Sequence, residues 1–216
     1  MHQGWRRHTR SKNAILIGGK GQYAGGDKAR AKGASGRIVD VRETAEAIVM
    51  AGDATAAYQS EAPGVEHVLR TIHVVRDRYL VVVDEVRLAE PAPVTWLLHT
   101  GGTLVGGGTT FRLTGERAGL YGQFVYSSAG APKLEVVEGF PGVADAEIEG
   151  LARHRHIAAT TPPTRRLALV TLLVPYALAA PRRVLHFIDD QGHGVNVYLV
   201  DEEGDEYKIA LGDIVV

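Results

Sequence analysis

The sequence predicts an all-β protein, built as a multi-layer antiparallel β-sandwich with long Gly-rich loops. The first reason is the distribution of glycine and proline. The 26 glycines and 9 prolines separate short runs rich in Val, Ile, Leu, Tyr and Thr, a pattern typical of strands and turns. The second is the continuously apolar run Tyr79–Val83. Such a strand is covered on both faces, so it predicts a layer above and a layer below. The third is the scarcity of helical patterns.

The expected strands are short and follow one another along the whole chain. Each has a length that is normal for a strand in a globular protein. In chain order they are Asn13–Ile17, Arg37–Val41, Ala47–Ala51, Val65–Val75, Tyr79–Val86, Val94–Thr100, Thr109–Leu113, Leu120–Tyr126, Lys133–Val137, His154–Ala159, Arg166–Val174, Val184–Ile188, Val195–Val200 and Glu206–Leu211.

The centre of the predicted core is the hairpin formed by Val65–Val75 and Tyr79–Val86, because the polar triplet Arg76–Arg78 separates two apolar runs. Two Gly-rich stretches, Gly18–Gly36 and Thr100–Gly108, are expected to be loops. Helical alternatives are limited. The residues of Thr44–Ala51 are suited to a helix, but Gly52 would end that helix early. Ala144–Leu151 is long enough for one or two helical turns.

Composition excludes several classes of protein. Lys+Arg number 24 against 25 Asp+Glu, so the chain lacks the basic excess of a general nucleic-acid binder. It has no cysteine, which excludes disulfides, thiolate metal sites and a cysteine nucleophile. No apolar run reaches the roughly 20 residues of a membrane helix, so no membrane partner is expected. Met1–Arg10 is polar and basic, unlike a secretory signal.

The run Gly19–Ala24 matches the G-x-G-x-x-A dinucleotide fingerprint. That motif works only where a helix begins at its second glycine, so that the helix N-terminus faces the pyrophosphate. The following glycines, Gly25, Gly26 and Gly33, are poor helix formers, so a flexible loop is favoured over a nucleotide site.

Nine histidines form the next candidate set. His154 and His156 have the spacing that places two imidazoles on one face of a strand, where they can hold a metal. Their arginine neighbours oppose a cation, so a solvated basic face is favoured. For His99, at the end of an apolar run, a hydrogen-bonded structural role is favoured over a catalytic one. His67 and His73 stand too far apart to chelate one ion. Neither His186 nor His193 has an Asp or Glu at a spacing that would indicate a functional site.

The segment Trp5–Asn13 holds four cations, a histidine and a tryptophan in nine residues. Arginine guanidinium groups suit carboxylate or sulfate, and Trp5 could offer a face to a sugar ring or a cation. A solvated N-terminal arm is the alternative interpretation. No G-x-S-x-G, H-E-x-x-H, EF-hand or paired-carboxylate pattern occurs, so no self-contained hydrolase is indicated.

The ordered set of segments resembles the C-terminal β-domain of the heparinase II/III-like polysaccharide lyases. The residues that carry the likeness include His8–Ile17, the turn Gly19–Gln22, Ala51–Tyr58, Val68–Glu85 and Thr95–His99. His156–Ala158 and Leu169–Pro175 look like the family's last paired strands. The likeness covers most of the chain, and it is the order of the segments rather than any one motif that is specific.

The resemblance implies a super-sandwich fold and β-eliminative cleavage of uronic-acid polysaccharides such as heparan sulfate or alginate. In the family an N-terminal α-toroid supplies an asparagine, a tyrosine and a histidine; the β-domain adds another histidine and often a structural zinc. This chain lacks the toroid and the family's H-x-H-x-D-x-G-S-F-like segment. Lys12 stands where many members have histidine, which argues against zinc there. The sequence itself requires no cofactor.

We therefore expect a single domain, residues 1–216, that forms one wall of an acidic-sugar cleft and has little or no lyase activity by itself. The residues expected nearest the sugar are Arg7, His8, Arg10, Asn13 and Gln22; none is expected to transfer the proton. The expected partners are an acidic polysaccharide and an N-terminal toroid domain or upstream chain. A non-catalytic acidic-carbohydrate-binding or interaction sandwich is the alternative, and an assembly domain the weaker one. A periplasmic or secreted location is implied by resemblance alone.

Overall fold

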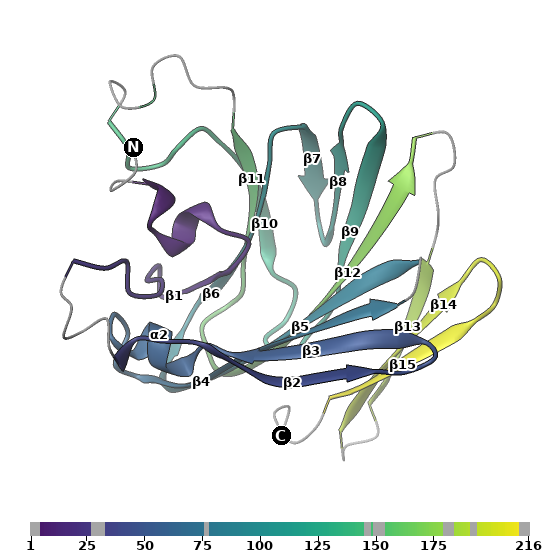
Figure 1. Cartoon of the computed structure of the whole chain (residues 1–216), viewed down its shortest axis with the longest axis horizontal. Coiled ribbons are helices and arrows are strands. Elements are labelled where there is room, and N and C mark those ends of the chain that lie inside the picture. Colours follow the sequence, from purple (N-terminus) through teal and green to yellow (C-terminus); the bar gives the residue numbers. More distant parts are fainter. Residues whose placement is uncertain are drawn as a thin grey trace.

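The structure is a computed structural model that describes residues 5–26, 33–75, 78–144, 148, 154–178, 184–190 and 194–211. Three antiparallel sheets make up the fold (Figure 1). The largest has the order β2-β3-β4-β5-β12-β9-β8-β7, the second β1-β6-β11-β10 and the third β13-β14-β15.

The strands follow the expected runs closely. Their bounds are β1 Ile15–Ile17, β2 Arg37–Glu43, β3 Ala47–Asp53, β4 Val65–Val75, β5 Tyr79–Ala92, β6 Val94–Thr100, β7 Thr103–Gly107, β8 Thr110–Thr114, β9 Ala118–Ser127, β10 Lys133–Glu138, β11 Arg155–Thr160, β12 Thr164–Ala177, β13 Val184–Asp190, β14 Val195–Asp201 and β15 Glu206–Leu211. Short helical segments in the described part of the chain include the 3-10 turn η2 Thr9–Ser11 and the helix α2 Thr55–Gln59.

The eight-stranded sheet is the middle layer, and side chains on its two faces enter different cores. In β5, Val81 and Val83 pack toward the three-stranded sheet, whereas Val86 packs toward the four-stranded sheet. In β12, Leu169 and Val170 are divided between the two cores in the same way. The period of two along a strand produces this division. The prediction of a layer above and a layer below this strand is therefore confirmed for β5, although within Tyr79–Val83 the cluster residues Tyr79, Val81 and Val83 all face the three-stranded sheet.

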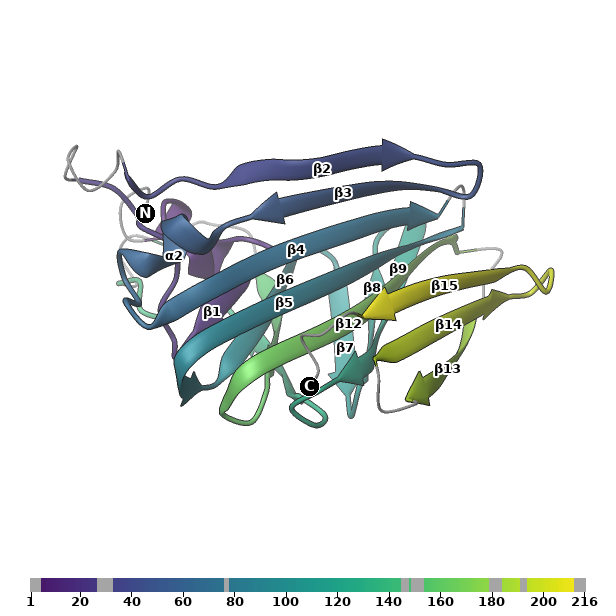
Figure 2. The same cartoon turned by 90° about the horizontal axis from the view of Figure 1, so that it is seen from below.

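The long strands β2 to β5 run side by side, with β13–β15 beside them, whereas β1 and the N-terminal turn lie toward the opposite side (Figures 1 and 2). Burial explains why these elements form: the 14-residue β12 has seven buried residues, among them Leu167, Leu169, Val170 and Leu172, none with any exposed area. Removing each such side chain from water stabilises the fold by roughly 1.5–3 kcal/mol.

Three sequence-based expectations need correction. The Gly-rich stretch Thr100–Gly108 is not simply a bend, because β7 forms within it and pairs with β8. The apolar run near Asn13 becomes a strand only at Ile15. The strand expected at Ala47–Ala51 forms as β3, and the helix lies at Thr55–Gln59, where none was expected. The helical turns expected over Ala144–Leu151 fall almost entirely outside the described residues. None of the helices in the described part of the chain is long and apolar enough to cross a membrane.

Candidate functional site

A pocket opens where the chain turns after β1. Ile15 and Ile17 are each 3% exposed and fix β1 against β6. The backbone then reverses through Gly18 and Gly19, whose φ angles of 57° and 77° suit glycine. Paired hydrogen bonds between the backbones of Ile17 and Lys20, 2.8 and 2.9 Å long, close this turn. The turn directs the next residues back across η2.

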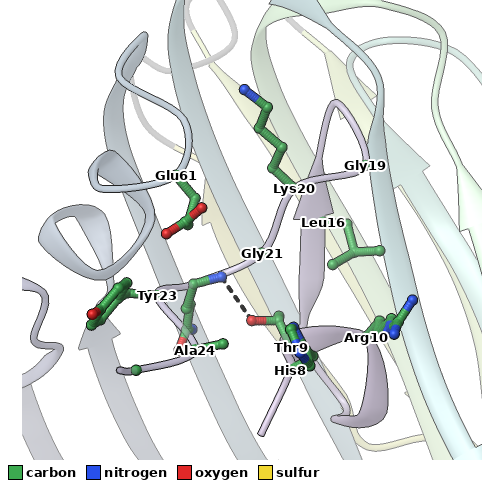
Figure 3. A pocket seen from close by; sticks show the side chains of 12 residues that line it. His8, Thr9, Arg10, Leu16, Gly19, Lys20, Gly21, Tyr23, Ala24 and Glu61 are labelled. Carbon is green, nitrogen blue, oxygen red and sulfur yellow. Dashed lines mark hydrogen bonds between the residues drawn. The ribbon is translucent and has the colours of Figure 1, made fainter. Parts of the chain in front are cut away.

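The side chain of Thr9 in η2 binds the backbone segment that follows this turn. Its Oγ1 accepts a hydrogen bond of 2.7 Å from the backbone N–H of Gln22, drawn as a dashed line in Figure 3. Gly21 lies directly against Thr9, and a Cβ at that position would collide with the threonine side chain. Glycine at position 21 is therefore required for this close approach. No helix begins at Gly21 among the described residues, so the dinucleotide interpretation of Gly19–Ala24 is wrong.

The resulting cavity, which we call the basic pocket, has a volume of about 590 Å³. Arg10 and Lys20 bring positive charge to it, Glu61 brings one carboxylate, and Tyr23 adds a phenol. In Figure 3, Glu61 and Tyr23 lie on one side and the η2 residues on the other. The full lining is His8, Thr9, Arg10, Leu16, Gly19, Lys20, Gly21, Gln22, Tyr23, Ala24, Gly25 and Glu61.

Four of the five predicted sugar-binding residues gather here. His8, Arg10 and Gln22 line the basic pocket, and the Arg7 guanidinium packs against Gly25 at its edge. Asn13 does not line it. Its Oδ1 accepts a hydrogen bond of 2.9 Å from the backbone N–H of His99, so its side chain ties the start of β1 to the end of β6.

A buried ion pair supports this part of the structure. Arg70 donates two hydrogen bonds to the Asp84 carboxylate, at 2.7 and 3.0 Å, and a third of 2.7 Å to the backbone carbonyl of Asn13. The Tyr58 hydroxyl donates a hydrogen bond of 2.7 Å to the carbonyl of Ile15. Burial raises the pKa of Tyr58 to about 12, so the phenol stays protonated. Together these bonds fix β1 to the middle sheet.

Next to the basic pocket, three histidines come together. His99 ends β6 and lies directly opposite His156 of β11 in the antiparallel pairing. His154 is two residues before His156 and lies on the same face. One ring nitrogen of His99 and one of His154, Nδ1 and Nε2, are 2.8 Å apart and share a hydrogen bond. The three histidines each offer a ring nitrogen within 4.8 Å of the others. We call this group the histidine cluster.

Aromatic rings enclose the histidine cluster. The Trp5 indole lies 5.7 to 6.3 Å from the three imidazoles, centroid to centroid, and Phe140 stacks on His154 at 5.0 Å. Trp5 is only 4% exposed, so it offers no free face to a sugar, and the solvated-arm interpretation of this segment is wrong at this residue. The Arg10 guanidinium carbon also lies 5.6 Å from the indole centroid. Trp5 thus contacts both the histidine cluster and a residue that lines the basic pocket.

The basic strand face expected around His154 and His156 is also wrong. Alternation along β11 turns Arg155 to the opposite side, where its Nε donates a hydrogen bond of 2.9 Å to Glu138. His156 is 5% exposed. Burial lowers the pKa of His99 and of His156 to about 4, and it lowers the pKa of His154 as well. The imidazoles are therefore neutral at neutral pH.

Within the described part of the chain, one group of acidic residues also has its side chains close enough together to hold a metal ion. It consists of Asp201, Glu203 and Asp205 in the β14–β15 turn. Arg78 occupies it, with Nη1 at 2.6 Å from the Asp201 carboxylate and a second contact to Asp205. This one guanidinium offsets part of the charge of the three carboxylates and holds them together, so the group is an ion-pair network of the turn.

The comparison with families of known proteins decides the identity of the fold. The family described as "Heparinase II/III-like, C-terminal" matches residues 1–184. The chain belongs to this family. No curated protein matches it.

Solved structures show the same fold for this heparinase II/III-like domain. A crystal structure of heparinase III superposes with a TM-score of 0.70 at 12% identity, covering 96% of this chain and 30% of that one. Heparan sulfate lyase HepC from Pedobacter heparinus gives 0.69 at 12%, with coverage of 94% and 30%. The heparinase III BT4657 gene product gives 0.68 at 13%, with 96% and 31%. The chain spans about a third of the length of these structures.

The zinc position implied by the family does not fit this heparinase II/III-like domain. Lys12, exposed at the entry to β1, stands where the resemblance implies a histidine in many members of the family. An ammonium group has three donors and no lone pair for a metal, and its charge repels a cation. Sequence reasoning identified His154 and His156 as a pair but missed His99 as their neighbour, because the register between β6 and β11 cannot be read from one sequence.

Proposed function

We propose that this chain is the β-domain part of a polysaccharide lyase that acts on uronic-acid polysaccharide, and that its basic pocket binds the acidic sugar. The observation that carries the proposal is the convergence of Arg10, Lys20 and His8 with the amide of Gln22 around one cavity. Guanidinium and ammonium groups pair strongly with carboxylate and sulfate, and a cavity of about 590 Å³ accommodates a small number of sugar units.

The chemistry of the family gives these cations a role. In β-elimination a base removes the proton from C5, the C4–O bond breaks, a C4–C5 double bond forms and an acid protonates the departing oxygen. Negative charge accumulates on the uronate carboxylate as the C5 proton leaves. Fixed positive charges at that carboxylate stabilise the intermediate and lower the barrier. Arg10 and Lys20 would serve this purpose in the basic pocket.

We also propose that the residues which move the proton are supplied by another domain or chain, such as an α-helical toroid, and that this single domain has little or no activity alone. The chain's span of about a third of the related structures supports this proposal. A periplasmic or extracellular location, where acidic polysaccharides are met, belongs to the same proposal.

A direct assay separates the parts of the proposal. The purified chain is mixed with heparan sulfate or with alginate, and the absorbance of the new C4–C5 double bond is followed. We expect binding without turnover. Robust turnover would overturn the claim that the catalytic machinery is incomplete. Absence of binding to either polysaccharide at low salt would overturn the claim for the basic pocket.

Variants locate the binding. Arg10→Ala and Lys20→Ala are each expected to weaken binding about tenfold, the equivalent of about 1.4 kcal/mol. Arg112→Ala on β8 and Lys208→Ala on β15 remove the same charges from other sheet regions and are the matched controls. Binding to the unaltered chain should weaken as salt rises, because surface charges are screened. Equal losses in the pocket variants and the controls would contradict the assignment.

The second candidate function is a non-catalytic acidic-carbohydrate-binding module. The basic pocket favours it to the same degree, because binding needs no acid–base pair. The DNA immediately upstream of the Met1 codon discriminates the two: a reading frame that encodes a toroid and the histidine-rich segment favours the lyase, and an unrelated gene favours the binding module.

A further inference from the structure

We propose that His99, His154 and His156 form a binding site for a zinc-type divalent cation. The site is distinct from the basic pocket and does not depend on glycan binding. Its residues come from two paired strands, with His99 and His156 directly opposite each other and His154 beside them. The family position occupied by Lys12 contributes no ligand.

The geometry is close to that of a bound metal. Zinc–nitrogen bonds are 2.0–2.1 Å, which places two nitrogens of a tetrahedral site about 3.3 Å apart. Here one nitrogen from each histidine lies within 4.8 Å of the other two, and the His99–His154 pair is already at 2.8 Å. Small rotations of the imidazoles bring all three to bonding distance, and the fourth position remains for water or another ligand.

An unpartnered nitrogen points to a missing ligand. His156 is 5% exposed, and its Nδ1 has no hydrogen-bond partner. His99 differs, because its Nδ1 faces His154 in a hydrogen bond and its buried Nε2 is the nitrogen without a partner. Leaving a buried nitrogen such as His156 Nδ1 unpaired costs about 1–3 kcal/mol, and a cation coordinated by that nitrogen would remove the cost.

The donor set selects the class of cation. Three neutral imidazoles suit Zn²⁺, Cu²⁺, Ni²⁺ or Co²⁺, whereas Ca²⁺ and Mg²⁺ require oxygen ligands. No carboxylate belongs to the cluster. Lys12 carries a positive charge that acts on His99 and opposes a bound cation. A cation bound here would link the end of β6 to β11 beneath Trp5, and Trp5 leads into the η2 turn that carries His8 and Arg10.

The test uses the tag-free chain, freed of metal with a chelator and titrated calorimetrically with Zn²⁺ and, separately, with Ca²⁺. We expect one Zn²⁺ per chain and no Ca²⁺ binding. Co²⁺ should give the visible absorption of a site of low coordination number with nitrogen ligands. Absence of Zn²⁺ binding by the unaltered chain would overturn the proposal.

Substitutions identify the ligands. His154→Gln and His156→Gln should each weaken Zn²⁺ binding by about 100-fold or more, since even outer partners of ligands are worth about 10–100-fold. His67→Gln on β4 removes a histidine outside the cluster and should leave the affinity unchanged. Equal affinity in all three variants would overturn the proposal. If His156→Gln does not fold, two measurements still test the proposal. They are the Zn²⁺ affinity of His154→Gln, a less buried position just before β11, and the Co²⁺ spectrum of the unaltered chain.

The two proposals fail separately. Zn²⁺ binding is measured without glycan, and glycan binding is measured in the presence of chelator. Loss of one with retention of the other shows which of the two sites is wrong.

Discussion

Removing the Asp84 carboxylate should destabilise the fold more than any surface ion pair does. The Asp84 side chain is 2% exposed and the Arg70 side chain 24% exposed, so the two charges face each other largely out of water. Asp84→Ala leaves the Arg70 guanidinium buried with only the Asn13 carbonyl as a partner. Breaking a buried pair in this way costs about 3–5 kcal/mol in the free energy of unfolding.

Urea denaturation followed by circular dichroism measures that loss. The control is Arg165→Ala, because Arg165 pairs with Glu90 at side-chain exposures of 59% and 81% and such pairs contribute about 0–1 kcal/mol. The double variant Arg70→Met/Asp84→Leu should recover much of the stability, since it leaves no unpaired charge. A loss in Asp84→Ala as small as the loss in the control would refute the argument that this pair fixes β1 to the middle sheet.

Three further outcomes follow from the packing and the hydrogen bonds. In the folded protein the pKa of Tyr58 is about 12, above its ordinary value of 10. The protonated phenol therefore contributes its full stabilisation below pH 10, and this contribution disappears as the pH rises toward 12. Tyr58→Phe should reduce this alkaline loss of stability in denaturation curves measured across that range. Gly21→Ala should weaken heparan sulfate binding severalfold while Gly107→Ala, with open space around it and no left-handed φ, leaves binding unchanged; equal binding by both would contradict the role of the Thr9 contact. Leu169→Ala, at a position with no exposed area, should lower the free energy of unfolding by about 2–5 kcal/mol, and a loss under about 1 kcal/mol would contradict the two-core arrangement.

The all-β class and most strand positions could be predicted because they depend on local signals. The run Tyr79–Val83 indicated a strand covered on both faces, and β5 does lie between two cores: Tyr79, Val81 and Val83 enter one, and Val86 enters the other. Gly18 and Gly19 likewise marked the turn that shapes the basic pocket. Boundaries were harder: β7 has the glycines of a loop and becomes a strand only because β8 pairs with it.

The candidate sites were harder to predict, because they depend on contacts between residues far apart in the chain, which one sequence does not reveal. Arg10 and His8, singled out by charge, both line the basic pocket, whereas Trp5, expected to offer a face to a sugar, is buried against the imidazoles. His99 is 55 residues from His154 in the chain, and only the register of β6 with β11 brings them together. A one-residue shift in that register would turn the imidazoles to opposite faces.

The measurement that tests the central claim most directly is an NMR titration of the isotope-labelled chain with a short heparan sulfate or alginate oligosaccharide. If the basic pocket is the wall of an acidic-sugar cleft, the largest amide shift changes should fall on Thr9–Arg10 and Lys20–Ala24, and they should shrink in Arg10→Ala. Changes confined to β13–β15, or no changes at low salt, would contradict it.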